Sequence, residues 1–146
     1  MSLNLTDAAD RVKRNETNLQ TITEMSAAAA IAKTRALALI IKETPSILNN
    51  QKELKLIREK LDVDELHVSD APGKLIASLV NNSYHGKGNY HGFNLAKEKQ
   101  SRVFMQAVTD PAFELVQEPQ LNGAEKELFQ YTGVARPDEP GVVQIG

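Results

Sequence analysis

The sequence of 146 residues contains no cysteine and no tryptophan. The missing cysteine excludes disulfides, thiolate zinc sites and cysteine catalysis. The formal net charge is −2 and no block of basic residues occurs, so the chain offers no electrostatic surface for nucleic acid. No apolar run reaches the ~18 residues of a membrane helix, because Lys33 and Arg35 interrupt the longest one. Hydrophobic residues nevertheless make up 41% of the chain, which is enough for the core of one domain.

Proline and glycine are also missing before Pro45, and this stretch predicts one long helix over residues 6–42. At 1.5 Å per residue the helix would be about 55 Å long. A compact core of about 100 residues is narrower than that, so part of the helix is expected to project beyond it. Two interpretations remain open: a stalk that continues a membrane helix and pairs with a second copy, or an ordinary core helix whose start frays.

The remaining pattern predicts short elements. A helix over residues 51–61 has Leu54, Ile57 and Leu61 on one face. Strands are expected at 65–69, 74–78, 113–117, 126–135 and 142–145, and a third helix at 95–108. The predicted fold class is therefore α+β, with an antiparallel five-stranded sheet and a long N-terminal helix packed along it. We divide the chain into a stalk and dimerisation helix at 1–46 and a sensor-like core at 47–146.

The last sixteen residues, YTGVARPDEPGVVQIG, predict a β-hairpin that stops at its final strand. A domain rarely ends directly after an apolar edge strand with nothing to cover it. We therefore expect the chain to be a piece of a longer protein. Asp138 and Glu139 lie in the proline-flanked turn of this hairpin, where solvated charges are the rule.

Three segments, in this order, resemble the single Cache family, the PAS-like sensor modules that bacterial receptors expose outside the membrane. They are ELHVSDAPGKLIAS at 65–78, SRVFMQAV at 101–108 and YTGVARPDEPGVVQIG at 131–146. The resemblance implies a ligand pocket on the sheet face away from the long helix. It also implies membrane helices before the long helix and after the last strand. Amino-acid receptors with two Cache modules carry a set that includes tryptophan, which this chain lacks, so the resemblance does not support an amino-acid ligand.

The candidate ligand-binding residues come from the irregular segment 81–94 and from the sheet. The aromatic walls of the ligand pocket would be formed by Tyr84, Tyr90 and Phe93. His85 and His91 would donate hydrogen bonds to the ligand or accept them from it. Arg102 would anchor a carboxylate or phosphate. Gln117, Tyr131 and Gly133 complete the set from the sheet side, whereas His67 is interpreted as a surface or rim residue. The spacing of His85 and His91 matches no zinc signature, and we expect neither a metal nor a cofactor.

The sequence favours an extracytoplasmic ligand-sensing domain of a bacterial transmembrane receptor, of the chemotaxis-receptor or histidine-kinase type. The expected partners are a small molecule, for which an organic anion is preferred, and a second copy bound through the N-terminal helix. One alternative is a cytosolic PAS-like module that dimerises without an obligatory ligand. A small enzyme is a weaker alternative, because GxSxG, HExxH and phosphate-loop patterns are absent.

Overall fold

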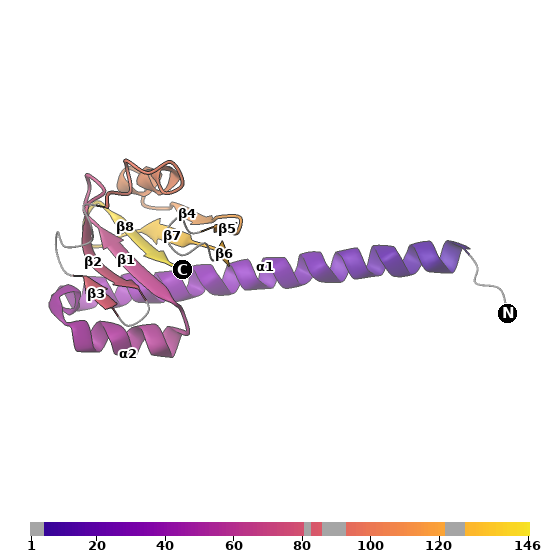
Figure 1. Ribbon diagram of the computed structural model, residues 1–146, viewed down its shortest axis with the longest axis horizontal. Helices are drawn as coiled ribbons and strands as arrows, with labels where there is room; N and C mark the ends of the chain where they lie inside the picture. The colour runs from indigo at the N-terminus through magenta and orange to yellow at the C-terminus, as the bar shows by residue number, and fades with distance from the viewer. Residues whose placement is uncertain (1–4, 81–82, 86–92, 122–127) are drawn as a thin grey trace.

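A long helix, α1 (Leu5–Glu43), forms one side of the protein. The computed structural model describes residues 5–80, 83–85, 93–121 and 128–146. The N-terminal half of α1 extends away from the folded body (Figure 1), and each described side chain between residues 8 and 26 is exposed. The prediction that part of the helix projects is therefore confirmed. The helix ends just before Pro45, since a residue that precedes proline disfavours the helical backbone.

The C-terminal half of α1 packs on the sheet. Leu37, Ala38 and Ile41 recur at helical spacing and are buried there. A 3₁₀-helix, η1 (Pro45–Asn49), turns the chain into α2 (Gln51–Leu61). The start of α2 is capped by Asn50, whose side-chain oxygen accepts a hydrogen bond from the Glu53 amide at 3.2 Å. The predicted bounds of this second helix are confirmed.

The main sheet has six strands in the order β3-β2-β1-β8-β7-β4, and every neighbouring pair is antiparallel. Its strands are β1 (Glu65–Ser69), β2 (Leu75–Val80), β3 (Ser83–His85), β4 (Glu114–Val116), β7 (Thr132–Ala135) and β8 (Val142–Ile145). A separate pair is formed by β5 (Gln120–Leu121) and β6 (Leu128–Phe129). The predicted α+β class is confirmed, and the short edge strand β3 joins the five predicted strands.

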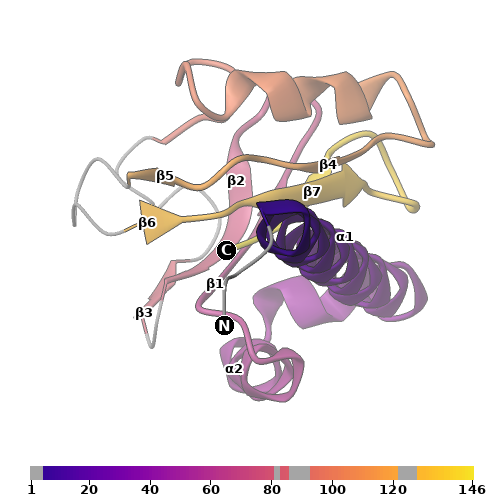
Figure 2. The ribbon, with the colours of Figure 1, turned by 90° about the vertical axis from the view of Figure 1, so that its right-hand side faces the viewer.

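The two faces of the sheet bury different clusters. Leu66, Val68 and Val143 face α1 and α2, in one apolar cluster with Leu37 and Leu54. The opposite face is covered by the 3₁₀-helix η2 (Arg102–Val108), which places Phe104 and Ala107 in a second cluster. Figure 2 shows η2 on the side of the sheet opposite to α1 and α2. A sheet covered on both faces in this way leaves little of its surface to solvent.

The prediction of a helix over 95–108 is wrong in its first half, because only Arg102–Val108 is helical, and as a 3₁₀-helix. The preceding residues form turns that local side chains stabilise. Ser101 Oγ donates to the Leu95 carbonyl at 2.7 Å, and Asn94 Oδ1 accepts from the Ala96 amide at 2.8 Å. Such bonds compete with the helical backbone ladder.

The β7–β8 turn is held by a buried arginine. Arg136 donates from Nη1 to the Ser69 carbonyl at 2.9 Å and from Nη2 to Asp138 Oδ2 at 2.8 Å. The expectation of solvated charges in this turn holds for Glu139, whose side chain is 57% exposed. Asp138 is an exposed residue whose side chain turns toward Arg136 and is only 15% exposed. Burial alone would raise the pKa of Asp138, but the hydrogen bond and charge of Arg136 outweigh it and lower that pKa below its usual value.

Candidate functional site

A row of polar side chains lies on the sheet face that η2 covers. Strand β1 alternates, so that Leu66 and Val68 point toward α1 while Glu65 and His67 point to the opposite face. Glu65 is 2% exposed and His67 is 5% exposed. The interpretation of His67 as a surface or rim residue is therefore wrong. Its neighbour strands and the cover over this face remove it from solvent.

His67 lies between a hydroxyl and a carboxylate. Its Nδ1 is 2.7 Å from Ser78 Oγ, and its Nε2 is 3.4 Å from Glu65 Oε1. The hydroxyl of Tyr131 donates to the other carboxylate oxygen, Oε2, at 2.7 Å. Because an ionised carboxylate can only accept, the Nε2 atom of His67 carries a proton. Two side chains from β1, one from β2 and that of Tyr131, which precedes β7, thus form one hydrogen-bonded network.

The ionisation of Glu65 reflects this network. Burial of the side chain would by itself raise the pKa of Glu65. The hydrogen bond and positive charge of His67, together with the hydrogen bond from Tyr131, outweigh that effect and lower the pKa below its usual value. The site therefore holds a buried carboxylate in its charged form at neutral pH.

Gln144 extends the row onto β8. It pairs with His67 on one side and with Gly133 on the other, and its side chain is 4% exposed. Because directly paired residues of neighbouring strands share a face, Gln144 lies beside His67 on the face that carries Gly133.

Aromatic rings lie at the β7 end of the row of polar side chains. The ring of Phe104 lies directly over Gly133, where an added Cβ would come within 2.4 Å of the Phe104 Cδ1 atom. Phe113 meets Phe104 edge to face, with ring centroids 6.4 Å apart. The ring of Tyr131 lies 6.5 Å from that of His67. Gly133 thus admits an aromatic side chain close to the backbone of the sheet.

Two predicted site residues, Tyr131 and Gly133, lie on this face. Gln117 is joined to the first of them through the backbone, where its amide donates to the Tyr131 carbonyl at 2.9 Å. The side chain of Gln117 donates to the carbonyl of Gln100 at 2.6 Å. This contact ties β4 to the segment that precedes η2.

Other predicted residues take different positions. Arg102 is exposed at the start of η2, and its Nε donates to the Ala96 carbonyl at 3.2 Å. Phe93 is half-buried against the cluster beneath η2. Tyr84 and His85 belong to β3, where only the backbone is described, and Tyr90 and His91 lie outside the described residues. Their role in ligand binding stays a prediction.

Sequence reasoning missed Glu65, His67, Ser78 and Gln144 as site residues. A signal for them existed, because polar residues at alternate positions of a strand all point to one face. On a half-exposed sheet the same alternation marks the solvated face, which is why His67 is predicted at the surface or rim. In the folded chain Glu65 and His67 are 2% and 5% exposed, which reverses that prediction.

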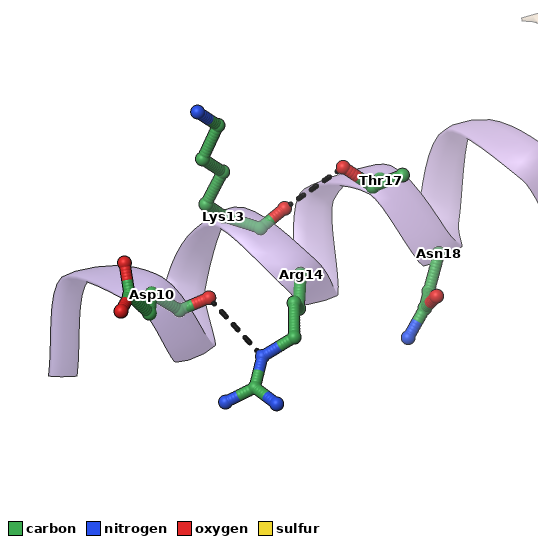
Figure 3. Close-up of a pocket in the computed structure, with 5 residues that line it drawn as sticks. All are labelled: Asp10, Lys13, Arg14, Thr17 and Asn18. Carbon is green, nitrogen blue, oxygen red and sulfur yellow. Dashed lines mark hydrogen bonds between the residues drawn. The ribbon is translucent and has the colours of Figure 1, made fainter. Parts of the chain in front are cut away.

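A hollow on the projecting part of α1 has no comparable structure (Figure 3). Asp10, Lys13, Arg14, Thr17 and Asn18 line it. All five are exposed and belong to a single stretch of helix, so nothing from the folded body closes over them. Arg14 and Thr17 donate only to helix carbonyls, at 3.4 and 3.0 Å. This hollow therefore offers no enclosed binding site.

In the part of the chain that the structure describes, no group of three or more His, Asp or Glu side chains is placed to hold a metal ion. No helix in those residues combines the length and apolar character needed to cross a membrane.

Comparison by sequence finds no matching protein-family model and no matching curated protein. Comparison by structure finds the ligand-binding domain of the Campylobacter jejuni chemoreceptor Tlp3. In its complex with 4-methylisoleucine this domain matches 97% of the chain with a TM-score of 0.63 and 13% identity. A second structure of it, with isoleucine bound, has the same TM-score. The chain spans 57% of the length of the first of these.

Two further structures match. The sensor domain of the histidine kinase DctB of V. cholerae matches 97% of this chain, with a TM-score of 0.54 and 16% identity over 54% of its own length. The Bacillus subtilis YkuI protein, which has an EAL domain, matches 96% of this chain with a TM-score of 0.65 and 11% identity over 36% of its own length. The Tlp3 structure is of a ligand-binding domain and the DctB structure is of a sensor domain. The chain therefore has the PAS-like Cache fold of sensor domains in a chemoreceptor and a histidine kinase.

Proposed function

We propose that this chain is the extracytoplasmic ligand-sensing domain of a bacterial transmembrane receptor, and that it binds a small molecule on the sheet face beneath η2. The observation that carries the proposal is the buried polar row on that face, formed by Glu65, His67, Ser78 and Gln144. Burying polar groups reduces stability unless hydrogen bonds compensate for the lost water. The fold that the chain shares with the ligand-binding domain of Tlp3 and the sensor domain of DctB supports ligand sensing as the purpose of this row.

The arrangement of the sheet gives the signal a route to α1. Strand β7 carries Gly133 and follows Tyr131 on the ligand face, while its opposite face packs on α1. Strand β4, its neighbour, is linked to the same helix by an ion pair between Arg35 and Glu114. A ligand that binds one position of β7 more tightly than another favours that position and moves α1 with it. The free energy available for this shift is limited to the difference in binding free energy between the two positions.

The projecting half of α1 is proposed to pair with a second copy of the chain. Val12 and Leu19 are 58% and 66% exposed and lie seven residues apart, on one side of the helix. This spacing is typical of the seam of a coiled coil. The same seam would also suit a cytosolic dimerising module. The cellular location of the domain therefore distinguishes that module from an extracytoplasmic sensor. Protease added to spheroplasts should cut a receptor tagged within this domain, whereas a cytosolic module would be protected.

A thermal-shift screen tests ligand sensing directly. Small carboxylates, amines, amino acids, sugars and purines would each be titrated against the purified domain. A ligand at 100 times its dissociation constant stabilises the fold by about 2.7 kcal/mol. A concentration-dependent rise in Tm that Gln144→Leu abolishes would support sensing at the polar row. A rise that this variant leaves unchanged would place the ligand elsewhere, and no rise with any compound would favour the dimerising module.

A further inference from the structure

The projecting half of α1 carries an apolar stripe that the described part of the folded body does not cover. Ala8, Val12 and Leu19 belong to it and all three are exposed, the last two by 58% and 66%. Their spacing of four and seven residues keeps them on one side of a helix with 3.6 residues per turn. Figure 1 shows this part of α1 extending away from the sheet and from α2. A second helix can bury such a stripe.

Asn15 lies within the stripe and discriminates between arrangements of the two helices. If Val12 and Leu19 occupy position a of a heptad, Asn15 occupies position d, which also faces the partner. A buried amide lowers stability unless its polar atoms are paired. In a parallel, in-register pair Asn15 lies opposite its own copy, so the two amides can bond to each other. In an antiparallel pair a d residue lies opposite an a residue, and Asn15 would face valine or leucine.

The charged residues that flank the stripe favour the same arrangement. Arg11 is at position g and Glu16 at position e, and both are exposed. In a parallel pair a g residue lies beside the e residue five positions further on in the partner, so Arg11 of each copy meets Glu16 of the other. An antiparallel pair brings g to g and e to e, which offers no opposite charges. The g positions hold Arg11, Asn18 and Met25, and the e positions hold Ala9, Glu16 and Thr23.

The stripe ends before α1 packs on the sheet. The a positions that follow Leu19 hold the polar residues Ser26 and Lys33. The side chains of α1 that the apolar core buries come later, at Leu37 and Ile41. Pairing over residues 8–22 therefore leaves the contact of α1 with the sheet intact. Two heptads bury little surface, so isolated copies should pair weakly.

We infer that residues 8–22 form a parallel, in-register two-stranded coil with a second copy of this chain, specified by Asn15 and by contacts of Arg11 with Glu16 between the copies. The inference rests on the pairing proposed above and gives it an orientation and a register. In this arrangement the two folded bodies lie at the same end of the coil, and a shift of one α1 acts on the other α1 along the shared stripe.

Cysteine cross-linking tests the orientation, because the chain has no cysteine of its own. Ala8→Cys and Leu19→Cys place a thiol in the stripe, and Thr17→Cys places one on the opposite, exposed side. In a glutathione redox buffer each stripe variant should form disulfide-linked dimers at least about tenfold faster than Thr17→Cys, because pairing raises the effective thiol concentration. Equal rates for all three variants would overturn the inference.

A mixture of the two stripe variants distinguishes the orientations. In a parallel pair, residues 8 and 19 of different copies are eleven positions apart, about 16 Å along the helix, so Ala8→Cys should join only Ala8→Cys and Leu19→Cys only Leu19→Cys. An antiparallel pair centred between Val12 and Asn15 would bring residue 8 beside residue 19. A predominance of the mixed disulfide, identified by mass spectrometry, would therefore overturn the parallel arrangement.

A charge exchange tests the contact of Arg11 with Glu16. In the Leu19→Cys background, Arg11→Glu makes both flanking positions acidic and Glu16→Arg makes both basic. At redox equilibrium roughly four-fifths of the disulfides should be mixed instead of the statistical half, because the mixed pair has two attractive contacts and each like pair has two repulsive ones. The matched control, Lys13→Glu with Asp10→Lys on the exposed opposite side, should stay at half. A statistical result in the first mixture would overturn the role of these charges.

Asn15→Leu gives an independent readout. Asn15 is exposed in the single copy, so the variant should fold normally. Removing a polar residue from a seam strengthens association and relaxes its specificity. Cross-linking of Leu19→Cys should therefore become about tenfold faster, and mixed disulfides between residues 8 and 19 should appear. Slower cross-linking would overturn the role of Asn15.

These outcomes are separate from those of the sensor function. Ligand sensing is measured by the thermal shift and does not depend on how the copies pair. A domain that responds to a ligand but cross-links without preference for the stripe would keep the sensor and overturn the coil. A domain that cross-links as expected but responds to no compound would support the coil and contradict the sensor.

Discussion

Tyr131 donates its hydroxyl hydrogen to Glu65 Oε2 over 2.7 Å, and the two residues are 66 positions apart in the sequence. The bond joins the residue before β7 to the first residue of β1, although β8 lies between these strands in the sheet. It also places a neutral donor on a carboxylate that is 2% exposed. Two strands that are not neighbours in the sheet are thereby linked through the candidate site.

Tyr131→Phe should lower the free energy of unfolding by about 1–3 kcal/mol at neutral pH, because a buried carboxylate loses a donor. The pKa of folded Glu65 is lowered, so its contribution to stability is complete above the ordinary value of 4.5 and is lost as the pH falls through the lower, folded-state value. The difference between the variant and the wild type should therefore shrink below that pH. Urea unfolding at pH 7 and at pH 3 measures both effects, and a difference that is constant with pH would contradict the assignment.

Gly133→Ala should destabilise the fold by about 1–3 kcal/mol, as overpacking does in a tightly filled core. The new Cβ would lie within 2.4 Å of the Phe104 ring. Phe104→Leu removes the clash at the expense of a cavity, so the double variant should be more stable than the two single effects predict. Additive effects in a double-mutant cycle of urea midpoints would show that the ring moves aside without cost.

Much of the fold follows from local patterns. The uninterrupted run before Pro45 predicts α1, and the alternation in ELHVS together with Gly73 predicts the β1–β2 hairpin. Gly73 has φ of +97°, and Asp70 Oδ1 accepts from the Lys74 amide at 2.8 Å, as such a turn requires. Local signals suffice in these places because neighbouring residues satisfy the backbone themselves.

The site was less predictable because its burial is a tertiary property. Whether Glu65 and His67 face solvent depends on contacts across the fold, such as that of Glu65 with Tyr131, which is 66 residues further along the chain. Nothing in ELHVS indicates those contacts. Arg102 attracted attention because a guanidinium is a good anion ligand, yet the structure places it exposed beside Ala96. The groups that a side chain can bind follow from its residue type, but which side chains lie close together depends on the packed fold.

Asp138→Asn should reduce the sensitivity of the fold to acid. The pKa of Asp138 lies below its ordinary value of 3.8 in the folded protein, so the carboxylate stabilises the fold above that value and stops doing so as the pH falls through the folded-state value. The wild type should thus lose more stability between pH 4.5 and pH 2.5 than the variant, as measured by urea unfolding. Asp10→Asn, on the exposed part of α1, should follow the wild type. Equal acid sensitivity in all three proteins would contradict a stabilising pair between Arg136 and Asp138.

The ion pair between Arg35 and Glu114 links α1 to β4, and both side chains are 46% exposed. Exposed pairs contribute about 0–1 kcal/mol, so Arg35→Glu should change the free energy of unfolding little. If β4 passes a ligand-induced shift to α1, the same variant should reduce the output of the full receptor while ligand binding to the isolated domain is unchanged. The double variant Arg35→Glu with Glu114→Arg restores opposite charges and should recover the output. An output that survives in Arg35→Glu would assign the transmission to the contact of α1 with β7 instead.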